Sequence, residues 1–599
     1  MPAEPAVVSL TASGAGTAGC IAALIGAQPL RLPLGEEGVP ADLRALFAAG
    51  RPIVAVMAAG VVIRALAPLI ASKRAEPPVV AVAEDGSSAV PLLGGHRGAN
   101  DLARRIAGAL GGVAAVTTAG DLRLGVALDA PPAGWRLDNP LDAKPAMAGL
   151  LAGRPGRLAG HAPWLDALAV ERTAGVEGAA VLSVEGAEPL VYRQRRLALG
   201  VGCARGCDPD EMVALVQSSL AEAGLAAGAV AGVFSLDLKA DEAAVHALAA
   251  NLDAPARFFD AATIEAVAPR LATPSATVFA EVGCHGVAEG AALVAAGPSA
   301  ALTLAKRKSA NATCAVAGIP AREDWTPPGR PRGRLAVVGI GPGGAETRTP
   351  EVSRLVAEAE DLVGYGLYLD LLGPLAAATP RHDFPLGGEE ARCRHALELA
   401  GEGRRVALVC SGDGGIYAMG ALVMELIARG DGPNGVSPAA RRVEVVNAPG
   451  VSAMQVASAR AGALLGHDFC AISLSDLLTE RDTILRRVRA AAVGDFAIAF
   501  YNPVSQRRRT LLAEARGILA DHRPPETPVV LARNLGRPGE TVRLVTLATL
   551  DVEAVDMLTT VLVGASASRA FASGDRAAGA GGAFAYTPRG YAAKHAMTP

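Results

Sequence analysis

Residues 335–344 read LAVVGIGPGG, an apolar run followed by a glycine-rich loop. The run predicts a buried strand, and the glycines predict a tight turn at its carboxyl end. Three later apolar runs end in the same manner: residues 406–410 before SGDGGIY, 443–446 before NAPGVSA, and 496–500 before YNP. Helical segments separate these runs, so we expect an α/β fold with a mainly parallel sheet in this half of the chain.

The loop at 339–344 matches the pattern G-x-G-x-x-G of dinucleotide-binding proteins letter by letter. That site requires a helix that begins directly at the loop and an acidic residue at the end of the next strand. Here the first helix-start signal is Thr349-Pro350, and Glu360 and Asp361 precede the next strand. Pro342 also lacks the backbone N–H that a phosphate cradle would use. The loop therefore favours a glycine turn with another purpose.

The four loops share a position, because the carboxyl ends of parallel strands meet at one edge of a sheet, where ligands bind. Loops of this composition would form a pocket with backbone donors and few charges. Each loop can alternatively be an ordinary strand-to-helix turn without a ligand. Taken one at a time, the loops leave both interpretations open.

Together with ARNLGRPGE at 532–540, the ordered motifs GxGPG, GDGGIY, PGVSA and YNP carry a specific resemblance. They resemble the tetrapyrrole methyltransferases of cobalamin biosynthesis, and FYNPVSQRRR and ARNLGRPGE are most similar to the precorrin-3B C17-methyltransferases. The resemblance spans about residues 334–566, and TPRGY at 587–591 fits the tail of that family. It implies a two-lobed α/β enzyme that uses S-adenosylmethionine, acts on a tetrapyrrole and forms a homodimer through this domain.

The resemblance also implies a cofactor site formed by small, polar and aromatic residues of these loops. The set is Gly341, Pro342, Ser411, Gly412, Asp413, Ile416, Ser452, Ala453, Tyr501, Asn502 and Thr541. The sulfonium activates its own methyl group, so alignment of the acceptor carbon is the main task and no metal is needed. Ring contraction in the closest branch requires a general acid or base. Asp413 and Tyr417 are the candidates, whereas His467 is favoured as a structural residue.

Three arginines follow the YNP loop at 507–509. Tetrapyrrole substrates carry several carboxylates, and we expect Arg507, Arg508 and Arg537 to bind them through paired hydrogen bonds. The alternative for the run is a solvated helix face. Charge reversal at Arg507 is expected to raise the KM of the tetrapyrrole and to leave binding of S-adenosylmethionine intact.

The first 320 residues show a separate alternation of strands and helices. Strands are expected at 6–10, 53–57 and 79–82 with a helix at 100–110, and a second α/β unit is expected at 197–317. Residues 131–160 indicate a linker or a poorly packed piece, and REDWTPPGRPRGR at 322–334 indicates an extended surface linker. The expected domains are residues 1–130, 131–195, 196–320, 321–333 as linker, 334–569, and 570–599 as a weakly ordered tail.

Three motifs in this half carry a second resemblance: PLLGGHRGANDL at 91–102, LALGVGCARGCDPDEM at 197–212 and VGCHGVAEGAAL at 282–293. They are similar to the CbiG family, the cobalt-precorrin-5A hydrolases. The resemblance implies opening of a δ-lactone on the macrocycle and release of a two-carbon fragment as acetaldehyde.

Within these motifs, His96 is a candidate base, and Glu289 and Lys306 are candidates to assist it. Each has a structural alternative: His96 can cap its own helix, Glu289 can sit at a helix N-terminus, and Lys306 can simply be exposed. The spacing of Cys203 and Cys207 does not suit a zinc site, so two isolated thiols are expected. Two competing hypotheses are a non-catalytic tetrapyrrole-binding module in this half, and methyl transfer to another position by the other half.

Composition limits the remaining function classes. The chain has 56 Lys and Arg against 59 Asp and Glu, a net charge of −3, which gives no global field for nucleic acid. Its apolar fraction is 51% and its mean hydropathy +0.31, but the most apolar segment, residues 52–71, contains Arg64 and two prolines and does not predict a membrane span. Eight cysteines are too few for a disulfide framework, and no secretory leader is evident, so a cytoplasmic protein is expected.

Overall fold

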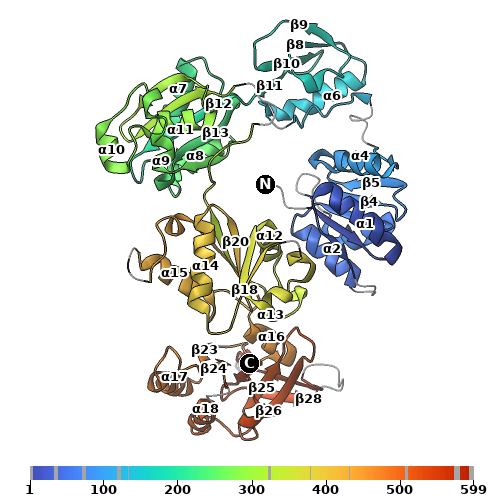
Figure 1. Cartoon of the computed structure of the whole chain (residues 1–599). Helices are drawn as coiled ribbons and strands as arrows, with labels where there is room; N and C mark the ends of the chain where they lie inside the picture. The colour runs from blue at the N-terminus through green and yellow to red at the C-terminus, as the bar shows by residue number, and fades with distance from the viewer. Residues whose placement is uncertain are drawn as a thin grey trace, which may run out of the picture.

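The computed structural model describes residues 5–32, 38–70, 76–117, 123–132, 134–320, 325–377, 379–430, 432, 434–505, 510–572 and 580–591. The chain forms several separate sheets, each with its own buried apolar cluster (Figure 1). The N-terminal, middle and third sheets belong to the first half, and two further five-stranded sheets form the lobes of the second half. The multidomain α/β fold expected from the sequence is confirmed.

The N-terminal sheet has the strand order β2-β1-β3-β4-β5-β6. Its strands are β1 (Ala6–Ser9), β2 (Pro29–Arg31), β3 (Ile53–Val56), β4 (Val79–Val82), β5 (Ser88–Leu93) and β6 (Val113–Ala114). Its helices are α1 (Ala12–Ile25), α2 (Gly38–Ala48), α3 (Ala59–Leu66) and α4 (Ala99–Leu110). The strands β1, β3 and β4 are parallel and wholly buried, which is why their apolar runs predicted them correctly.

The middle sheet, in the order β7-β11-β10-β8-β9, packs its own core. It consists of β7 (Trp135–Leu137), β8 (Gly156–Gly160), β9 (Glu171–Thr173), β10 (Ala179–Val184) and β11 (Leu190–Gln194), with helix α6 (Ala143–Leu151). Tyr192 is fully buried in this core, and its hydroxyl donates a hydrogen bond to the Leu128 carbonyl oxygen at 2.8 Å. The expectation of a linker or poorly packed piece at 131–160 was therefore wrong.

The third sheet has the order β14-β13-β12-β16-β15, with β16 antiparallel to both of its neighbours. Its strands are β12 (Leu197–Cys203), β13 (Val230–Leu236), β14 (Ala256–Phe259), β15 (Leu302–Lys308) and β16 (Ala312–Gly318). Its helices are α7 (Pro209–Glu222), α8 (Ala243–Asn251), α9 (Ala261–Glu265), α10 (Ala276–Val282) and α11 (Val287–Ala296). A Cβ at Gly200 would lie 1.9 Å from the Ala288 carbonyl oxygen, so only glycine lets α11 pack this closely on β12.

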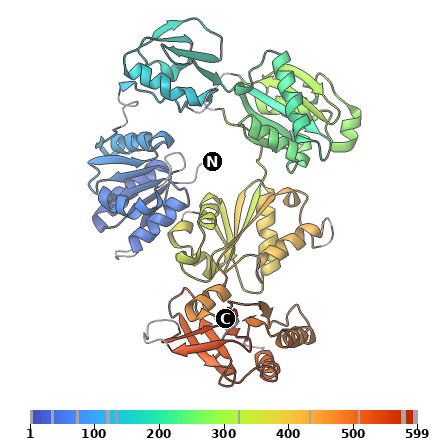
Figure 2. The ribbon, with the colours of Figure 1, turned by 180° about the vertical axis from the view of Figure 1, so that it is seen from behind.

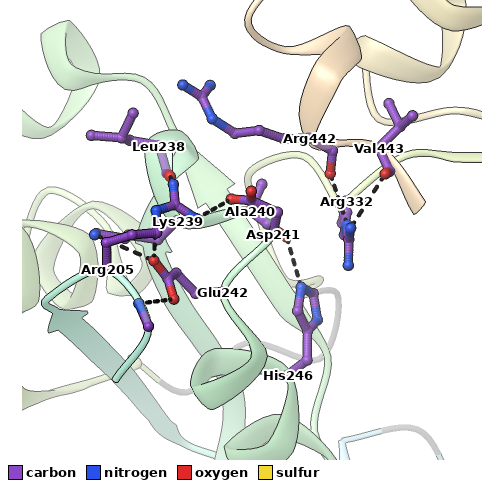
Figure 3. Close-up of polar contacts among 11 residues, drawn as sticks. Arg205, Leu238, Lys239, Ala240, Asp241, Glu242, His246, Arg332, Arg442 and Val443 are labelled. Atoms are coloured by element: carbon purple, nitrogen blue, oxygen red, sulfur yellow. Dashed lines mark hydrogen bonds and ion pairs between the residues drawn. The ribbon is translucent and has the colours of Figure 1, made fainter. Parts of the chain in front are cut away.

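Two arginines in the described part of the Pro/Arg linker contact the domains on either side of it. Arg330 donates to the Asp237 carboxylate at 2.7 Å, and its backbone pairs with Phe258. Arg332 donates to the carbonyl oxygens of Arg442 and Val443, at 2.8 and 3.2 Å (Figure 3). Arg330 and Arg332 thus connect the third sheet to the second half, while residues 325–332 form no helix or strand and are exposed or half-buried.

The first lobe of the second half is an all-parallel sheet in the order β19-β18-β20-β17-β21. Its strands are β17 (Arg334–Gly339), β18 (Asp361–Tyr365), β19 (Arg381–Phe384), β20 (Arg405–Cys410) and β21 (Glu444–Ala448). Its helices are α12 (Pro350–Glu358), α13 (Gly366–Asp370), α14 (Glu389–Gly401) and α15 (Met419–Ala428). As the sequence predicted, α12 starts at Pro350, and Thr349 accepts a hydrogen bond from the Val352 amide.

The second lobe is a mixed sheet in the order β23-β24-β27-β25-β26. It contains β23 (Phe469–Ser473), β24 (Ala497–Tyr501), β25 (Pro528–Arg533), β26 (Thr541–Thr546) and β27 (Thr559–Val563), with α16 (Ala453–Ala461), α17 (Arg481–Val493) and α18 (Thr510–Ala520). A small sheet joins β22 (Gly462–Ala463), β28 (Arg569–Ala572) and β29 (Ala583–Tyr586). Because Ala585 in β29 is fully buried, the expectation of a weakly ordered tail was wrong for residues 580–591.

The N-terminal sheet lies beside the first lobe although the middle and third sheets separate them in sequence (Figures 1 and 2). Helix α2 contacts α12, and Ala49 is buried in the same apolar cluster as Val352.

Among the described residues, no single helix is long and apolar enough to cross a membrane. The pair α10 and α11 meets that test only when joined, and it is bent by 80°.

Candidate active site

A cleft with a cavity volume of about 230 Å³ opens between the two lobes of the second half, beyond the carboxyl ends of β17, β20 and β24. Loops from both lobes form its wall. It is lined by Pro342, Tyr368, Ser411, Gly412, Asp413, Ile416, Tyr417, Ser452, Ala453, Tyr501, Asn502, Asn534, Leu535, Arg537, Met557, Leu558, Thr559 and Thr560. The four glycine- and proline-containing loops predicted from the sequence therefore meet at one hollow.

Glycines allow the loops of the first lobe to approach each other without side chains between them. The backbones of Gly341 and Gly412 exchange hydrogen bonds of 3.1 and 2.8 Å. A Cβ at Gly339 would lie 2.6 Å from the Gly412 carbonyl oxygen, so that position has no room for a side chain. Gly341 and Gly412 both adopt positive φ, at 77° and 66°, which glycine tolerates best. Gly412 thus lines the cleft, whereas Gly341 is not a lining residue but is hydrogen-bonded to Gly412.

Asp413 connects two of the cleft loops through its carboxylate. One oxygen accepts a hydrogen bond from the Gly415 amide at 2.7 Å, and the other accepts one from the Gly450 amide at 3.2 Å. The side chain therefore fixes the loop after β20 against the loop after β21. A carboxylate held in this way can still accept a further donor, because each oxygen has a second lone pair.

Tyr501, at the end of β24, joins the second lobe to the start of α16. Its hydroxyl lies 2.8 Å from the Ser452 hydroxyl and accepts a hydrogen bond from the Met454 amide at 3.3 Å. The Tyr417 ring lies 5.2 Å from the Tyr501 ring, and the Tyr417 hydroxyl donates to the Ala471 carbonyl oxygen. Burial raises the pKa of Tyr417, so this phenol is neutral at ordinary pH. The two rings form an aromatic wall of the cleft.

Arg537 is the cation that spans the cleft from the second lobe to the first. Its Nε donates to the Pro342 carbonyl oxygen at 2.6 Å, and its Nη2 donates to the Ser411 hydroxyl at 3.2 Å. The guanidinium also lies over the Tyr368 ring, 5.9 Å from the centroid. The unused N–H groups of Arg537 remain available to a carboxylate at the mouth of the cleft.

The structure places most, but not all, of the predicted residues at the cleft. Thr541 is exposed at the start of β26 and, like Gly341, is not among the lining residues, so its role in a cofactor site stays a prediction. Arg507 and Arg508 lie outside the described residues. His467 is partly exposed, and its Nδ1 lies 3.1 Å from the Asp468 carboxylate.

Sequence reasoning missed several lining residues. These are Tyr368, Asn534, Leu535 and the segment Met557 to Thr560. Asn534 and Leu535 belong to the ARNLGRPGE motif, which could have indicated them. Met557 and Leu558 precede β27, and Thr559 and Thr560 are its first residues, so the rule used for loops that follow a strand did not apply to them.

Two of the three candidates in the first half, Glu289 and Lys306, lie in contact with each other. His96 belongs to the N-terminal sheet, and its side chain is outside the described part of the structure, whereas Glu289 and Lys306 belong to the third sheet. Glu289 is only 2% exposed, and its carboxylate accepts hydrogen bonds from the Thr273 amide and hydroxyl and from the Lys306 amide. Glu289 therefore braces three segments, and it lies in the first turn of α11, the helix N-terminus that its structural alternative gave.

The cysteines behave as isolated thiols. Cys203 and Cys207 are both free, and burial raises the pKa of Cys203 to about 11. Within the part of the chain that the structure describes, no group of three or more His, Cys, Asp or Glu side chains could hold a metal ion.

Comparison with known families assigns these parts of the chain. Residues 334–551 match the model for tetrapyrrole (corrin/porphyrin) methylases. Residues 41–121 and 197–317 match the models for the N-terminal and C-terminal parts of the cobalamin synthesis G protein.

Individual relatives match the second half. A precorrin-3B C(17)-methyltransferase from Sinorhizobium sp is 42% identical over 242 residues, which are 40% of this chain and 91% of that protein. A probable cobalt-factor III C(17)-methyltransferase from Salmonella typhimurium is 42% identical over 230 residues, 38% of this chain and 92% of that protein. The crystal structure of the methyltransferase CobJ is 39% identical, covers 43% of this chain and 100% of its own, and gives a TM-score of 0.39.

The two-lobed fold and its interlobe cleft define the second half as a methyltransferase of the tetrapyrrole type. The chain belongs to the tetrapyrrole methylase family and carries both cobalamin synthesis G domains in its first half. It is a multifunctional enzyme of cobalamin biosynthesis.

Proposed function

We propose that residues 334–569 transfer a methyl group from S-adenosylmethionine to C17 of precorrin-3B or its cobalt form, with contraction of the ring. We also propose that the first half opens the lactone of a cobalt-precorrin-5A-type substrate. The observation that carries the first proposal is the convergence of loops from both lobes at one cleft. The similarity to the C17-methyltransferases supports the position of methylation.

The cleft residues fit S-adenosylmethionine. Gly412 and Ala453 leave the backbone accessible, and a Cβ at Gly412 would meet no atom closer than 3.9 Å, so the space before it is open. Ser411, Asp413 and Ser452 offer hydroxyl and carboxylate oxygens for the ribose and the ammonium group. When bound, S-adenosylmethionine supplies a methyl group already activated by its sulfonium.

The residues of this chain therefore have an orienting role. Asp413 and the Tyr501–Ser452 pair fix the loops that would hold the donor. Arg537 keeps Pro342 at its place on the opposite side and can pair with a substrate carboxylate. Holding donor and acceptor in line removes much of the entropic cost of a reaction between two molecules. Asp413 and Tyr417 remain the proposed acid–base candidates for the contraction step.

The methyl-transfer proposal is tested on the full chain with methyl-labelled S-adenosylmethionine and precorrin-3B or its cobalt form. We expect one labelled methyl group at C17 of a contracted macrocycle, measured by mass spectrometry and carbon assignment. Label at another carbon would favour a different precorrin position. An unlabelled macrocycle would contradict methyl transfer altogether.

The hydrolase proposal is tested on the same protein with cobalt-precorrin-5A. We expect release of acetaldehyde, measured with an aldehyde dehydrogenase coupled assay. A first half that binds the corrinoid, seen as a change in its absorption spectrum, but releases no acetaldehyde would instead be a tetrapyrrole-binding module.

The domain boundaries and the homodimer also remain proposals. Boundaries at 130, 195, 320, 333 and 569 would be tested by limited proteolysis with mass mapping of the fragments. Sedimentation of the full chain would test the proposed dimer, and a monomer at micromolar concentration would contradict it.

A further inference from the structure

His285 lies in the loop between α10 and α11, where nearly all of its polar groups are engaged. Its amide donates to one Glu265 carboxylate oxygen at 2.9 Å, and its carbonyl oxygen accepts from the Ser275 amide at 2.8 Å. Its ring Nδ1 lies 2.8 Å from the other Glu265 oxygen. Within the described part of the chain, the ring Nε2 has no hydrogen-bond partner.

The hydrogen bonds to Glu265 decide which ring nitrogen carries the proton. Hydrogen bonds from the His285 amide and ring hold the pKa of Glu265 below its usual range, so this carboxylate is ionised and can only accept. The Nδ1 atom is then the donor, and in the neutral ring Nε2 keeps a free lone pair. Such a pair resembles the orienting carboxylate and base of many hydrolytic sites.

The loop presents this ring in a fixed orientation beside an exposed aromatic surface. Gly283 ends α10 with φ of 76°. Cys284, the residue before His285, is fully buried, so the backbone that leads into His285 is anchored. The His285 ring stacks on Phe279 with centroids 4.4 Å apart and an angle of 26°. Phe279 is 44% exposed, which leaves an apolar face next to the base.

A cation lies close to the same segment. Lys306 Nζ is 3.4 Å from the Thr273 carbonyl oxygen, and Ser275, two residues further along, holds the His285 carbonyl. Glu289 ties Thr273 to Lys306 through its buried carboxylate, so this edge of the third sheet is rigid. A base, an apolar ring and a cation together suit a flat apolar ester that also carries carboxylates.

We propose that His285 is the catalytic base of the lactone-opening reaction and that Glu265 is its positioning residue. The water oxygen forms a bond to the lactone carbonyl carbon while the Nε2 of His285 takes a proton from that water. The ring carbon–oxygen ester bond then breaks, and the imidazolium returns the proton to the departing alkoxide, so that one water is consumed. The carbinol carbon of the opened product then breaks its bond to the macrocycle, the hydroxyl proton passes to the macrocycle carbon, and the two-carbon unit leaves as acetaldehyde. This inference rests on the proposed hydrolase function of the first half.

The test measures acetaldehyde release and methyl transfer by the full chain for the wild type, His285→Ala and Glu265→Gln. General-base loss predicts a fall of about 10²- to 10⁴-fold for His285→Ala, partly restored by added imidazole, with methyl transfer unchanged. Glu265→Gln should give a smaller fall because the ring is still present. His246→Ala is the matched control, since the ring of His246 in the same domain bonds to the Ala240 carbonyl oxygen and lies beside Phe258, away from Glu265, and should be dispensable (Figure 3).

The outcomes separate this inference from the function on which it rests. A wild-type chain that releases no acetaldehyde would overturn the hydrolase function and the role of His285 with it. An active wild type with an equally active His285→Ala variant would overturn the role of His285 alone. A loss that imidazole does not rescue, together with weaker corrinoid binding, would indicate a structural residue and would also overturn the proposal.

Discussion

The Nε of Arg537 in the second lobe donates a hydrogen bond to the carbonyl oxygen of Pro342 in the first lobe, at 2.6 Å. The same guanidinium reaches Ser411 on the next loop of the first lobe. One side chain thus sets the spacing of the two walls of the cleft. Because Pro342 and Ser411 follow different strands, Arg537 also holds their loops together.

Replacement of Arg537 by alanine is expected to lower kcat/KM for methyl transfer by about 10- to 100-fold, since hydrogen bonds from a charged group contribute ~1.5–3 kcal/mol. Lysine keeps the charge but not the fork geometry, so Arg537→Lys should recover only part of the loss. Steady-state kinetics with varied S-adenosylmethionine measures both variants. Arg354→Ala, which removes an exposed pair with Glu358, is the control and should be close to wild type.

The hydroxyl pair of Tyr501 and Ser452 should act as one unit. Tyr501→Phe and Ser452→Ala are each expected to raise the KM of S-adenosylmethionine by about 3- to 10-fold, the value of one neutral hydrogen bond. The double variant should lose less than the sum of the two single losses, because both variants remove the shared contact, although Tyr501→Phe also loses the Met454 amide and Ser452→Ala also loses the cap of α16. A double-mutant cycle on KM measures this coupling, and fully additive effects would show that the two hydroxyls act independently.

The parallel parts of the fold could be predicted because their strands are apolar on both faces. The run at 53–57 contains the buried strand β3, and its shortness, its β-branched residues and the turn expected at Ala59-Gly60 indicate a strand. The middle sheet escaped prediction because β8 and β9 are short, rich in glycine or charge, and half exposed. Its core depends on single inward residues such as Leu158 and Tyr192, and these contacts join strands far apart in sequence.

The cleft was predictable only where a parallel strand ends in a glycine or proline turn. The segment Met557 to Thr560 is the clearest omission. It leads into β27 and includes the first two residues of that strand, which is antiparallel to β24, so the amino end of β27 lies beside the carboxyl end of β24 at the cleft. No local signal in the sequence reports that reversal. The prediction of a weakly ordered tail was wrong for a similar reason, since β29 becomes a strand only through its partners β22 and β28.

The linker arginines should protect the junction between the third sheet and the first lobe. The double variant Arg330→Ala and Arg332→Ala removes the contacts to Asp237 and to the Arg442 and Val443 carbonyls. Because local opening becomes easier, we expect subtilisin to cleave residues 319–334 several-fold faster than in the wild type. Subtilisin replaces trypsin in this test because the variant lacks two arginines and trypsin cleaves after arginine. Arg172→Ala removes an exposed contact within the middle sheet and serves as the control. Equal cleavage rates would mean that other contacts hold the junction.

The buried thiol of Cys410 should make the first lobe sensitive to alkali. Burial raises the pKa of this thiol from its ordinary value near 9 to about 11. A raised pKa means that the folded state keeps the proton more tightly than the unfolded state does. The contribution to stability is therefore complete below pH 9 and is lost as the pH rises towards 11, at ~1.4 kcal/mol for each pH unit.

The measurement is the free energy of unfolding of the wild type and of Cys410→Ala at several pH values from 8 to 11. The variant should be less stable at pH 8, because it loses buried apolar atoms, but its stability should fall less steeply between pH 9 and 11. Cys20→Ala removes an exposed thiol and should leave the wild-type slope unchanged. Identical slopes for Cys410→Ala and the wild type would mean that Cys410 ionises equally readily in the folded and unfolded states. That result would contradict the buried position of Cys410 at the end of β20.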